Sequence, residues 1–337
     1  MKLFQNKICS AIAQEKGLDP GGNAAELRRM IVIETPLPWQ SNGIKNLPEG
    51  FQQLYKKFRA APNIGQLFKE LHITSFLLAA PAGADGTGKA VKRETTDRRV
   101  MIWSRNGDAS PVATRTVYQL PETKIADLGW ALTYKPETLS EFDRFLIEPH
   151  QNGRDFLVCT HGTRDVACAK FGVPLYKRLK EKLDEPDRVW RVSHFGGHVY
   201  APTMIEFPVG IYWAYVGNEQ LAQIVSRQGD VKTLKNHYRG WTGTPRGVVQ
   251  LAERELLLQI GWSWLDRPRT GRIIEQEDVD TPSWAVVELT VEDPEEIFTV
   301  RVERDGSVQT PASSTKLFKF AYTYPQYRSA VLADGLR

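Results

Sequence analysis

The sequence has few cysteines and no long hydrophobic run. Three cysteines in 337 residues cannot form a disulfide framework. No apolar run approaches the roughly 18–20 residues that span a bilayer. Met1–Ser10 has neither the long apolar stretch nor the small-residue cleavage site of a signal peptide. These absences predict a cytoplasmic protein without a membrane segment, in which neighbouring cysteines serve metal or redox chemistry rather than a structural disulfide.

Charge and motifs exclude further classes of function. The net charge is +4, and the basic residues do not gather in one block, so the sequence gives no electrostatic case for nucleic acid. The glycine-rich stretch at Gly83 and the Val209-Gly210 pair both lack G-x-G-x-x-G spacing, so no built-in NAD or flavin site is predicted. We find no paired-carboxylate motif, and we therefore expect no glycosidase activity.

Residues 1–146 predict an α/β domain. Arg29–Ile33 is rich in β-branched residues and predicts a strand, whereas Phe51–Phe58 has helical spacing. The other predicted segments are a helix over Pro62–Leu71, strands over Ile73–Ala79 and Val100–Trp103, and a mobile loop over Pro81–Asp97. Strands and helices in this order indicate an α/β domain.

Residues 147–231 predict a second domain. Pro174 suits a first helical turn, and leucines at four-residue spacing follow it, so we expect a helix to begin there. The predicted strands are Phe156–Val158, Val189–Val192, Met204–Phe207 and Ile211–Val216, and a helix is predicted over Asn218–Gln228. The resulting β–α–β–β–β–α order is close to that of a thioredoxin-like core.

Residues 232–337 predict an α+β extension that packs on the other two regions. Thr244-Pro245 is a plausible start for a helix that ends at Ile260. Trp284–Val291 and Ile297–Val302 alternate like strands, and Asp305-Gly306 is a strong signal for a tight turn. We expect a helix and a β-hairpin here.

Two short segments carry the residues with chemistry. Cys159 ends the first strand of the second region and Cys168 precedes its helix, while His194 and His198 follow the second strand. Loops at the same ends of neighbouring parallel strands lie side by side, so we expect these four side chains to converge. Gly196-Gly197 stands between the histidines and would cost a helix about 1.5–2 kcal/mol relative to alanine, which favours a loop.

Two thiolates and two imidazoles suit either zinc or an iron–sulfur cluster. Zinc sites usually take a tight C-x₂₋₄-C spacing, whereas eight residues separate Cys159 from Cys168. A wide loop fits the larger [2Fe–2S] cluster better. Two alternatives stay open, which are a structural zinc site and a thiol–disulfide oxidoreductase that uses Cys159 and Cys168 alone.

Other polar residues near the motif have simpler interpretations. His161 is more typical of a solvated or backbone-bonded histidine than of a ligand. Arg164 and Asp165 either tune the site or form a local ion pair. Residues with a default solvated or structural role are Lys170, Lys177, Arg178, Cys9, His72, His150 and His237.

The segments Cys159–Ala169, Gly172–Leu175 and Ser193–Pro202 together resemble the sucrase/ferredoxin-like family. Cys9-Ser10, Gly17–Pro20 and Glu34–Trp39 are also similar to that family, so the resemblance spans roughly Cys9 to Val216. It implies a thioredoxin-like ferredoxin domain whose [2Fe–2S] cluster is ligated by Cys159, Cys168, His194 and His198. His-x₃-His then stands where thioredoxin-like ferredoxins have C-x₃-C.

The resemblance also implies a function. We expect a one-electron carrier rather than a catalyst, with residues 147–231 as the ferredoxin domain and an unidentified redox partner. Residues 1–146 are expected to form a second, clusterless thioredoxin-like unit. Neutral imidazoles in place of two thiolates predict a reduction potential above the roughly −400 mV of plant-type all-cysteine clusters.

Overall fold

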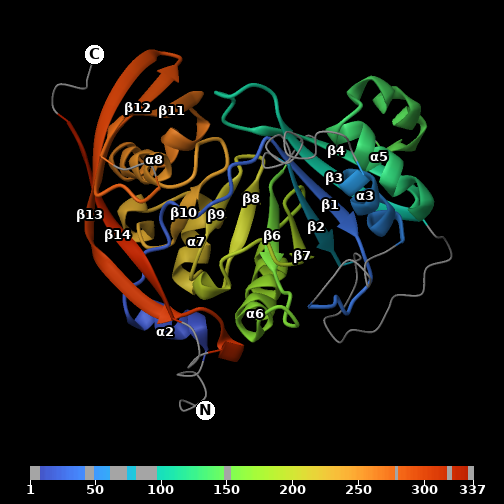
Figure 1. The fold of residues 1–337 in the computed structure, drawn as a ribbon, viewed down its shortest axis with the longest axis horizontal. Coiled ribbons are helices and arrows are strands. Elements are labelled where there is room, and N and C mark those ends of the chain that lie inside the picture. Colours follow the sequence, from blue (N-terminus) through green and yellow to red (C-terminus); the bar gives the residue numbers. More distant parts are fainter. Residues whose placement is uncertain are drawn as a thin grey trace.

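A ten-stranded mixed sheet forms the centre of the molecule, and a four-stranded antiparallel sheet curves along one side of it (Figure 1). The computed structural model describes residues 8–41, 49–60, 74–80, 97–147, 153–277, 280–316 and 321–332. The order of the long sheet is β10-β9-β8-β6-β7-β2-β1-β3-β4-β5. The α/β class predicted from the sequence is therefore confirmed.

The first half of the long sheet comes from the N-terminal residues. Its elements are β1 (Arg29–Glu34), α3 (Glu49–Ala60), β2 (Thr74–Ala79), β3 (Asp97–Arg105), β4 (Ala113–Pro121), α5 (Ile125–Thr133) and β5 (Leu146–Ile147). Strand β1 lies between a parallel neighbour, β2, and an antiparallel neighbour, β3. The predicted helix over Pro62–Leu71 lies outside the described residues, as does the predicted loop over Pro81–Asp97 except Asp97, which begins β3.

The second half of the long sheet repeats this arrangement. Its elements are β6 (Asp155–Cys159), α6 (Val166–Lys182), β7 (Arg188–Val192), β8 (Met204–Phe207), β9 (Ile211–Trp213) and α7 (Asn218–Ser226). Strand β6 lies between parallel β7 and antiparallel β8, as β1 lies between β2 and β3. The halves join where the last residues of β2 and β7, Ala79 and Val192, pair. This junction brings the carboxyl ends of both parallel pairs to one place.

Helix α6 begins earlier than the sequence predicts. The prediction placed its first turn at Pro174, but the helix starts at Val166 and Pro174 lies in its interior. The Asp165 side chain is the N-cap, because its Oδ1 accepts a hydrogen bond from the Ala167 amide at 2.9 Å. The cap and the one buried face of α6 offset the interior proline, which costs about 3 kcal/mol in an isolated helix. Cys168 therefore lies in the first helical turn rather than before it.

The C-terminal residues extend the long sheet and build the short one. Their elements are β10 (Tyr238–Trp241), α8 (Val248–Ile260), β11 (Arg269–Gln276), β12 (Trp284–Glu292), β13 (Glu295–Pro311) and β14 (Ala321–Val331). Strand β10 pairs with β9, so the long sheet continues beyond residue 231. Helix α8 packs against β10 and against the short sheet (Figure 1).

Two predicted features of this region are wrong in detail. Helix α8 begins at Val248 rather than at Thr244-Pro245. The tight turn predicted at Asp305-Gly306 is absent, because β13 runs through both residues. The pairing of β13 with β14 instead shifts register between Arg304 and Ser307. A positive φ of 87° at Gly306 suits such an irregularity, which explains the glycine without a hairpin.

Short helices complete the described chain. They are α2 (Cys9–Glu15) and the 3₁₀ segments η2 (Glu122–Lys124), η3 (Pro136–Phe145), η4 (His198–Tyr200), η5 (Val231–Leu234), η6 (Trp262–Asp266) and η7 (Ser314–Lys316). Within the ranges given above, every helix is too short or too polar to cross a bilayer.

Candidate metal centre

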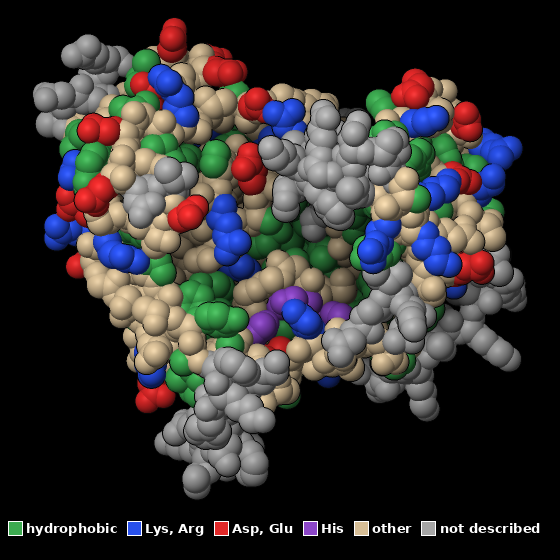
Figure 2. All heavy atoms as spheres, viewed as in Figure 1, with side chains coloured by type: hydrophobic (Ala, Val, Ile, Leu, Met, Phe, Trp, Pro, Cys, Tyr) green, Lys and Arg blue, Asp and Glu red, His purple; other side chains and the backbone are tan. Residues whose placement is uncertain are grey.

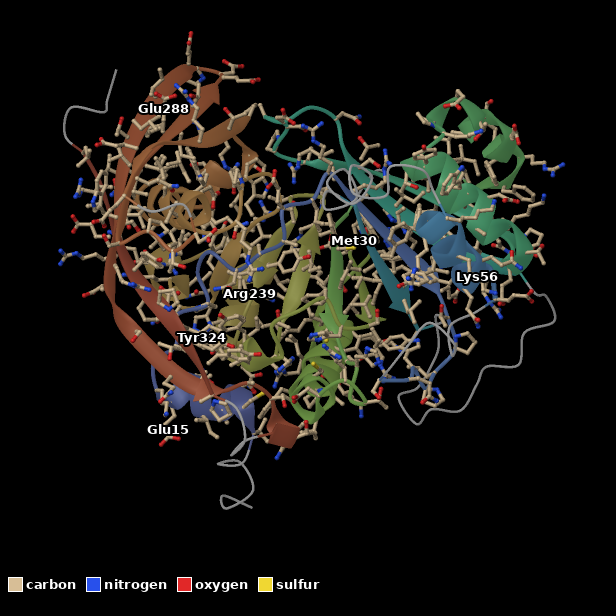
Figure 3. All side chains as sticks on the ribbon, viewed as in Figure 1. Glu15, Met30, Lys56, Arg239, Glu288 and Tyr324 are labelled. Atoms are coloured by element: carbon tan, nitrogen blue, oxygen red, sulfur yellow. The ribbon has the colours of Figure 1, made fainter. Side chains whose placement is uncertain are left out.

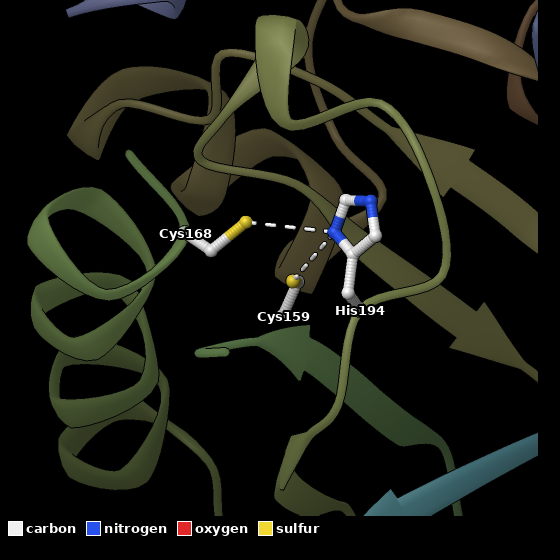
Figure 4. Close-up of side chains that lie close together, drawn as sticks. All are labelled: Cys159, Cys168 and His194. Atoms are coloured by element: carbon white, nitrogen blue, oxygen red, sulfur yellow. Dashed lines mark hydrogen bonds between the residues drawn. The ribbon is translucent and has the colours of Figure 1, made fainter. Parts of the chain in front are cut away.

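The two cysteines of the motif meet one histidine at the carboxyl end of β6. Cys159 is the last residue of β6, Cys168 comes from the first turn of α6, and His194 follows β7 (Figure 4). Nδ1 of His194 lies 3.7 Å from the Cys159 sulfur and 3.6 Å from the Cys168 sulfur. Both thiols are buried, whereas the imidazole is half-buried. The convergence expected for these three residues is present.

The loop that carries both histidines is held where it leaves β7. The Ser193 amide donates to the Leu78 carbonyl at 2.8 Å, and the Ser193 hydroxyl accepts from the Leu78 amide at 2.9 Å. Gly196 and Gly197 adopt φ values of 93° and 74°, a region that glycine enters without steric cost. The predicted loop between the histidines is therefore correct. Figure 2 shows histidine side chains gathered where this face of the molecule is hollowed.

His198 presents one nitrogen that has no partner. Its ring centroid is 5.3 Å from that of His194, and its Nε2 lies 2.7 Å from the Ala312 carbonyl oxygen. A carbonyl only accepts, so Nε2 carries a proton, and in the neutral ring this leaves the lone pair on Nδ1. This Nδ1 is buried and finds no hydrogen-bond partner among the described residues. A buried nitrogen in this state fits a metal ligand whose second nitrogen is fixed by a backbone carbonyl.

The two thiols differ in acidity because they are buried side by side. Burial opposes ionisation of Cys159, but hydrogen bonds from Cys168 and His194 outweigh it and hold the pKa of Cys159 well below its usual value. The hydrogen bond to Cys159 and burial raise the pKa of Cys168. The pair alone thus favours one thiolate, and a second negative charge requires a cation beside it.

The N-terminal half supplies one wall of the site. The Thr163 hydroxyl donates to the Trp39 carbonyl at 2.6 Å, and Nε2 of His161 lies 3.1 Å from the Gln40 carbonyl. Nδ1 of His161 accepts from the His194 amide at 3.2 Å. Both ring nitrogens of His161 are therefore engaged with backbone groups, in line with the backbone-bonded interpretation. Burial lowers the pKa of His161, which favours its neutral form.

A second group of donors lies behind His198. Cys9, Asp165 and His198 have donor atoms within 4.8 Å of one another. Asp165 is already occupied, because it accepts from the Ser314 amide at 2.9 Å and from the Ser314 hydroxyl at 2.6 Å. Burial raises the pKa of Cys9 to about 12, so this thiol stays protonated. We interpret the group as a hydrogen-bonded support that ties the C-terminal residues to the metal site.

Sequence reasoning missed this support. Ala312 and Ser314 lie more than a hundred residues from the motif, and neither has a side chain typical of metal chemistry. Asp165 carried a usable signal, since an acidic residue before a helical run is a common N-cap. Of the remaining candidates, Arg164, Lys170 and Lys177 are exposed, and Arg178 is half-buried. His237 bonds the Ala214 carbonyl at 3.0 Å, while His72 and His150 lie outside the described residues.

The fold and the site define an α/β protein in which Cys159, Cys168 and His194 form a group that could hold a metal ion. A family model described as Sucrase/ferredoxin-like matches residues 20–240, and the chain belongs to that family. The resemblance inferred from the motifs is thereby confirmed.

Curated relatives match a shorter segment. The chain is 37% identical over 100 residues to "Altered inheritance of mitochondria protein 32" of Debaryomyces hansenii, covering 26% of this chain and 36% of that protein. It is 31% identical over 97 residues to the protein of the same name from Meyerozyma guilliermondii, covering 25% of this chain and 33% of that protein. The chain thus spans about a third of the length of these relatives. No solved structure matches it significantly.

Proposed function

We propose that this protein is a one-electron carrier that binds a [2Fe–2S] cluster through Cys159, Cys168, His194 and His198. The observation that carries the proposal is the convergence of two buried thiols on Nδ1 of His194, with a buried and unpartnered Nδ1 on His198 nearby. Membership of a ferredoxin-like family supports the same ligand chemistry. When bound, the cluster would supply one-electron redox chemistry at the carboxyl end of β6.

The repeated strand order supports the thioredoxin-like part of the proposal. Both halves place their first strand between a parallel and an antiparallel neighbour. In the first half, the loop after β1 contains Trp39 and Gln40, which contact the cysteine loop of the second half. We propose that the first half is a clusterless unit that shields the metal site from solvent. His194 then remains as the half-buried ligand at the edge of the metal site. The redox partner would be another protein or a small molecule that reaches this edge.

A structural zinc site is the second candidate. A tetrahedral zinc ion with bonds of about 2.3 Å to sulfur and 2.0–2.1 Å to nitrogen separates these donors by about 3.6 Å. The distances of 3.6 and 3.7 Å to His194 agree with that value. His198 does not fall within this compact set of three donors, although it lies next to His194. Because the four donors do not all lie within reach of one tetrahedral ion, they favour the larger [2Fe–2S] cluster over zinc.

Composition of the purified protein decides between the two candidates. We would purify the full chain under anaerobic conditions and assay iron, zinc and acid-labile sulfide on one sample. The ferredoxin proposal expects about two iron and two sulfide per chain, with visible absorption that bleaches on reduction. About one zinc per chain in a colourless protein would refute the electron-transfer proposal and favour a structural zinc site. His198→Ala should lower cluster content, and His237→Ala is the matched control because that histidine bonds a backbone carbonyl elsewhere.

A further inference from the structure

Arg239 is a buried cation that has no counter-ion among the described residues. Its side chain stands on β10 and is only 3% exposed. In the described part of the chain no carboxylate forms an ion pair with it, and its Nε is buried without a partner. The guanidinium lies 5.1 Å from the ring centroid of Tyr200 and 5.3 Å from that of Tyr212. Burying an unpaired charge is costly, so this placement calls for a specific reason.

The Arg239 guanidinium forms hydrogen bonds next to both a cysteine and the histidines of the proposed ligand set. Its Nη1 donates to the Thr203 hydroxyl at 3.0 Å and, over a longer 3.4 Å, to the Gly196 carbonyl. The Thr203 carbonyl in turn accepts the amide of Cys159 at 3.2 Å. Gly196 lies between the two histidines of the motif. One side chain therefore ties the histidine loop to the strand end that holds a cysteine.

The histidine loop lies directly on this guanidinium. A Cβ atom added to Gly197 would meet Nη2 of Arg239 at 2.5 Å, and the backbone there has a φ of 74°. Nη2 also donates to the Asn23 carbonyl at 3.0 Å, so the guanidinium is held from a third side. Figure 3 shows Arg239 in the interior of the molecule, on the inner side of the outer strands β13 and β14. The Gly196-Gly197 pair thus permits a cation to approach the ligand loop closely.

We infer that Arg239 is a positioning residue for the metal centre and that its positive charge raises the reduction potential of the cluster. The inference rests on the proposed function. With two thiolate and two neutral imidazole ligands, a [2Fe–2S] cluster is neutral when oxidised and carries one negative charge when reduced. A fixed cation in a buried environment stabilises the reduced form, because little water screens the attraction. The missing carboxylate leaves the charge of Arg239 available for this effect.

The test compares Arg239→Gln and Arg239→Lys in the full-length holoprotein. Arg105→Gln is the matched control, because Arg105 is also buried, stacks on Trp241 at 4.6 Å and has no carboxylate ion pair among the described residues. Arg105 bonds the Val209 carbonyl at 3.1 Å. Val209 lies just beyond Phe207, which pairs with the first residue of β6, so Arg105 is at the end of that strand opposite Cys159. Iron and sulfide content, thermal stability and the potential by voltammetry are measured on each variant.

Arg239→Gln should lower the ratio of reduced to oxidised cluster at a fixed potential by roughly tenfold, a shift of about 59 mV for a one-electron couple. Arg239→Lys keeps the charge but cannot bridge Thr203 and Gly196 at once, so its potential should lie between those of Arg239→Gln and the unchanged protein. Arg105→Gln should lower stability and leave the potential unchanged. A loaded Arg239→Gln protein with the unchanged potential would overturn the inference.

Two further outcomes are informative. If Arg239→Gln does not fold, Arg239→Met replaces it, because methionine also removes the charge and a loaded Arg239→Met protein with the unchanged potential would equally overturn the inference. If the unchanged protein contains no iron and sulfide, the proposed function itself fails and the inference falls with it. A cluster-bearing protein whose potential ignores Arg239 leaves the proposed function intact and refutes only the role of this residue.

Discussion

Replacing Asp165 by alanine should destabilise the protein more than the loss of an ordinary helix cap. Asp165 caps α6 through the Ala167 amide and also accepts from the amide and the hydroxyl of Ser314. Loss of an N-cap costs about 1 kcal/mol. The Ser314 amide would lose its partner in a partly buried position, which adds roughly 1–2 kcal/mol. We therefore expect Asp165→Ala to lower the free energy of unfolding by about 2–3 kcal/mol.

Urea denaturation of the metal-free protein measures this difference, provided that the slope with denaturant is unchanged. Asp230→Ala is the matched control, because Asp230 caps η5 through the Lys232 amide at 3.0 Å in an exposed position. That substitution should cost no more than about 1 kcal/mol. Asp165→Asn keeps a capping oxygen and should fall between the two. Equal losses for Asp165→Ala and Asp230→Ala would refute the idea that Asp165 ties the C-terminal residues to the metal site.

Three further predictions concern Cys9, Gly172, and His161 together with His237. Burial raises the pKa of Cys9 to about 12. In a Cys159→Ser/Cys168→Ser background, alkylation of Cys9 at pH 8 should therefore be roughly a thousandfold slower in the folded protein than in the unfolded chain. Comparable alkylation rates, measured by mass spectrometry, would contradict this. Gly172→Ala would place a Cβ 2.0 Å from the Cys159 carbonyl oxygen. This substitution should lower the free energy of unfolding by about 1–3 kcal/mol and should lower the metal content. Pro174→Ala, at an exposed position on the same helix, should lower neither the stability nor the metal content. Burial lowers the pKa values of His161 and His237, so as pH falls through about 6.5 the unfolded chain binds protons first and stability falls. His161→Asn/His237→Asn should show a shallower decline in urea midpoint between pH 7 and 5, and an unchanged slope would refute that assignment.

Much of the sheet follows from local sequence. Strands β1, β3, β6 and β8 each contain a short apolar run, and the sequence predicts each within a few residues of its bounds. The motif also predicts the convergence of Cys159, Cys168 and His194, because parallel neighbours β6 and β7 end on the same side, whereas His198 lies outside that group. Strand β4 was missed because Arg115 and Gln119 interrupt its apolar alternation, although tertiary pairing with β3 holds it in the sheet.

What the sequence did not predict depends on contacts between distant segments. The sequence places the start of α6 too late, because proline is typical of a first helical turn, whereas the Asp165 cap and the burial of Cys168 decide the boundary. The support from Ala312 and Ser314 and the guanidinium of Arg239 come from the C-terminal third of the chain. None of these three residue types signals a metal site by itself, so only the folded arrangement identifies them.

Voltammetry of the anaerobically purified protein, beside His198→Cys, tests the proposed ligand set most directly. Two neutral imidazoles should place the potential well above −400 mV, toward the roughly −150 to +300 mV of Rieske centres, which also have two histidine ligands. Cysteine at position 198 adds a thiolate charge and should lower the potential. A potential near −400 mV that His198→Cys leaves unchanged would contradict ligation by two cysteines and two histidines.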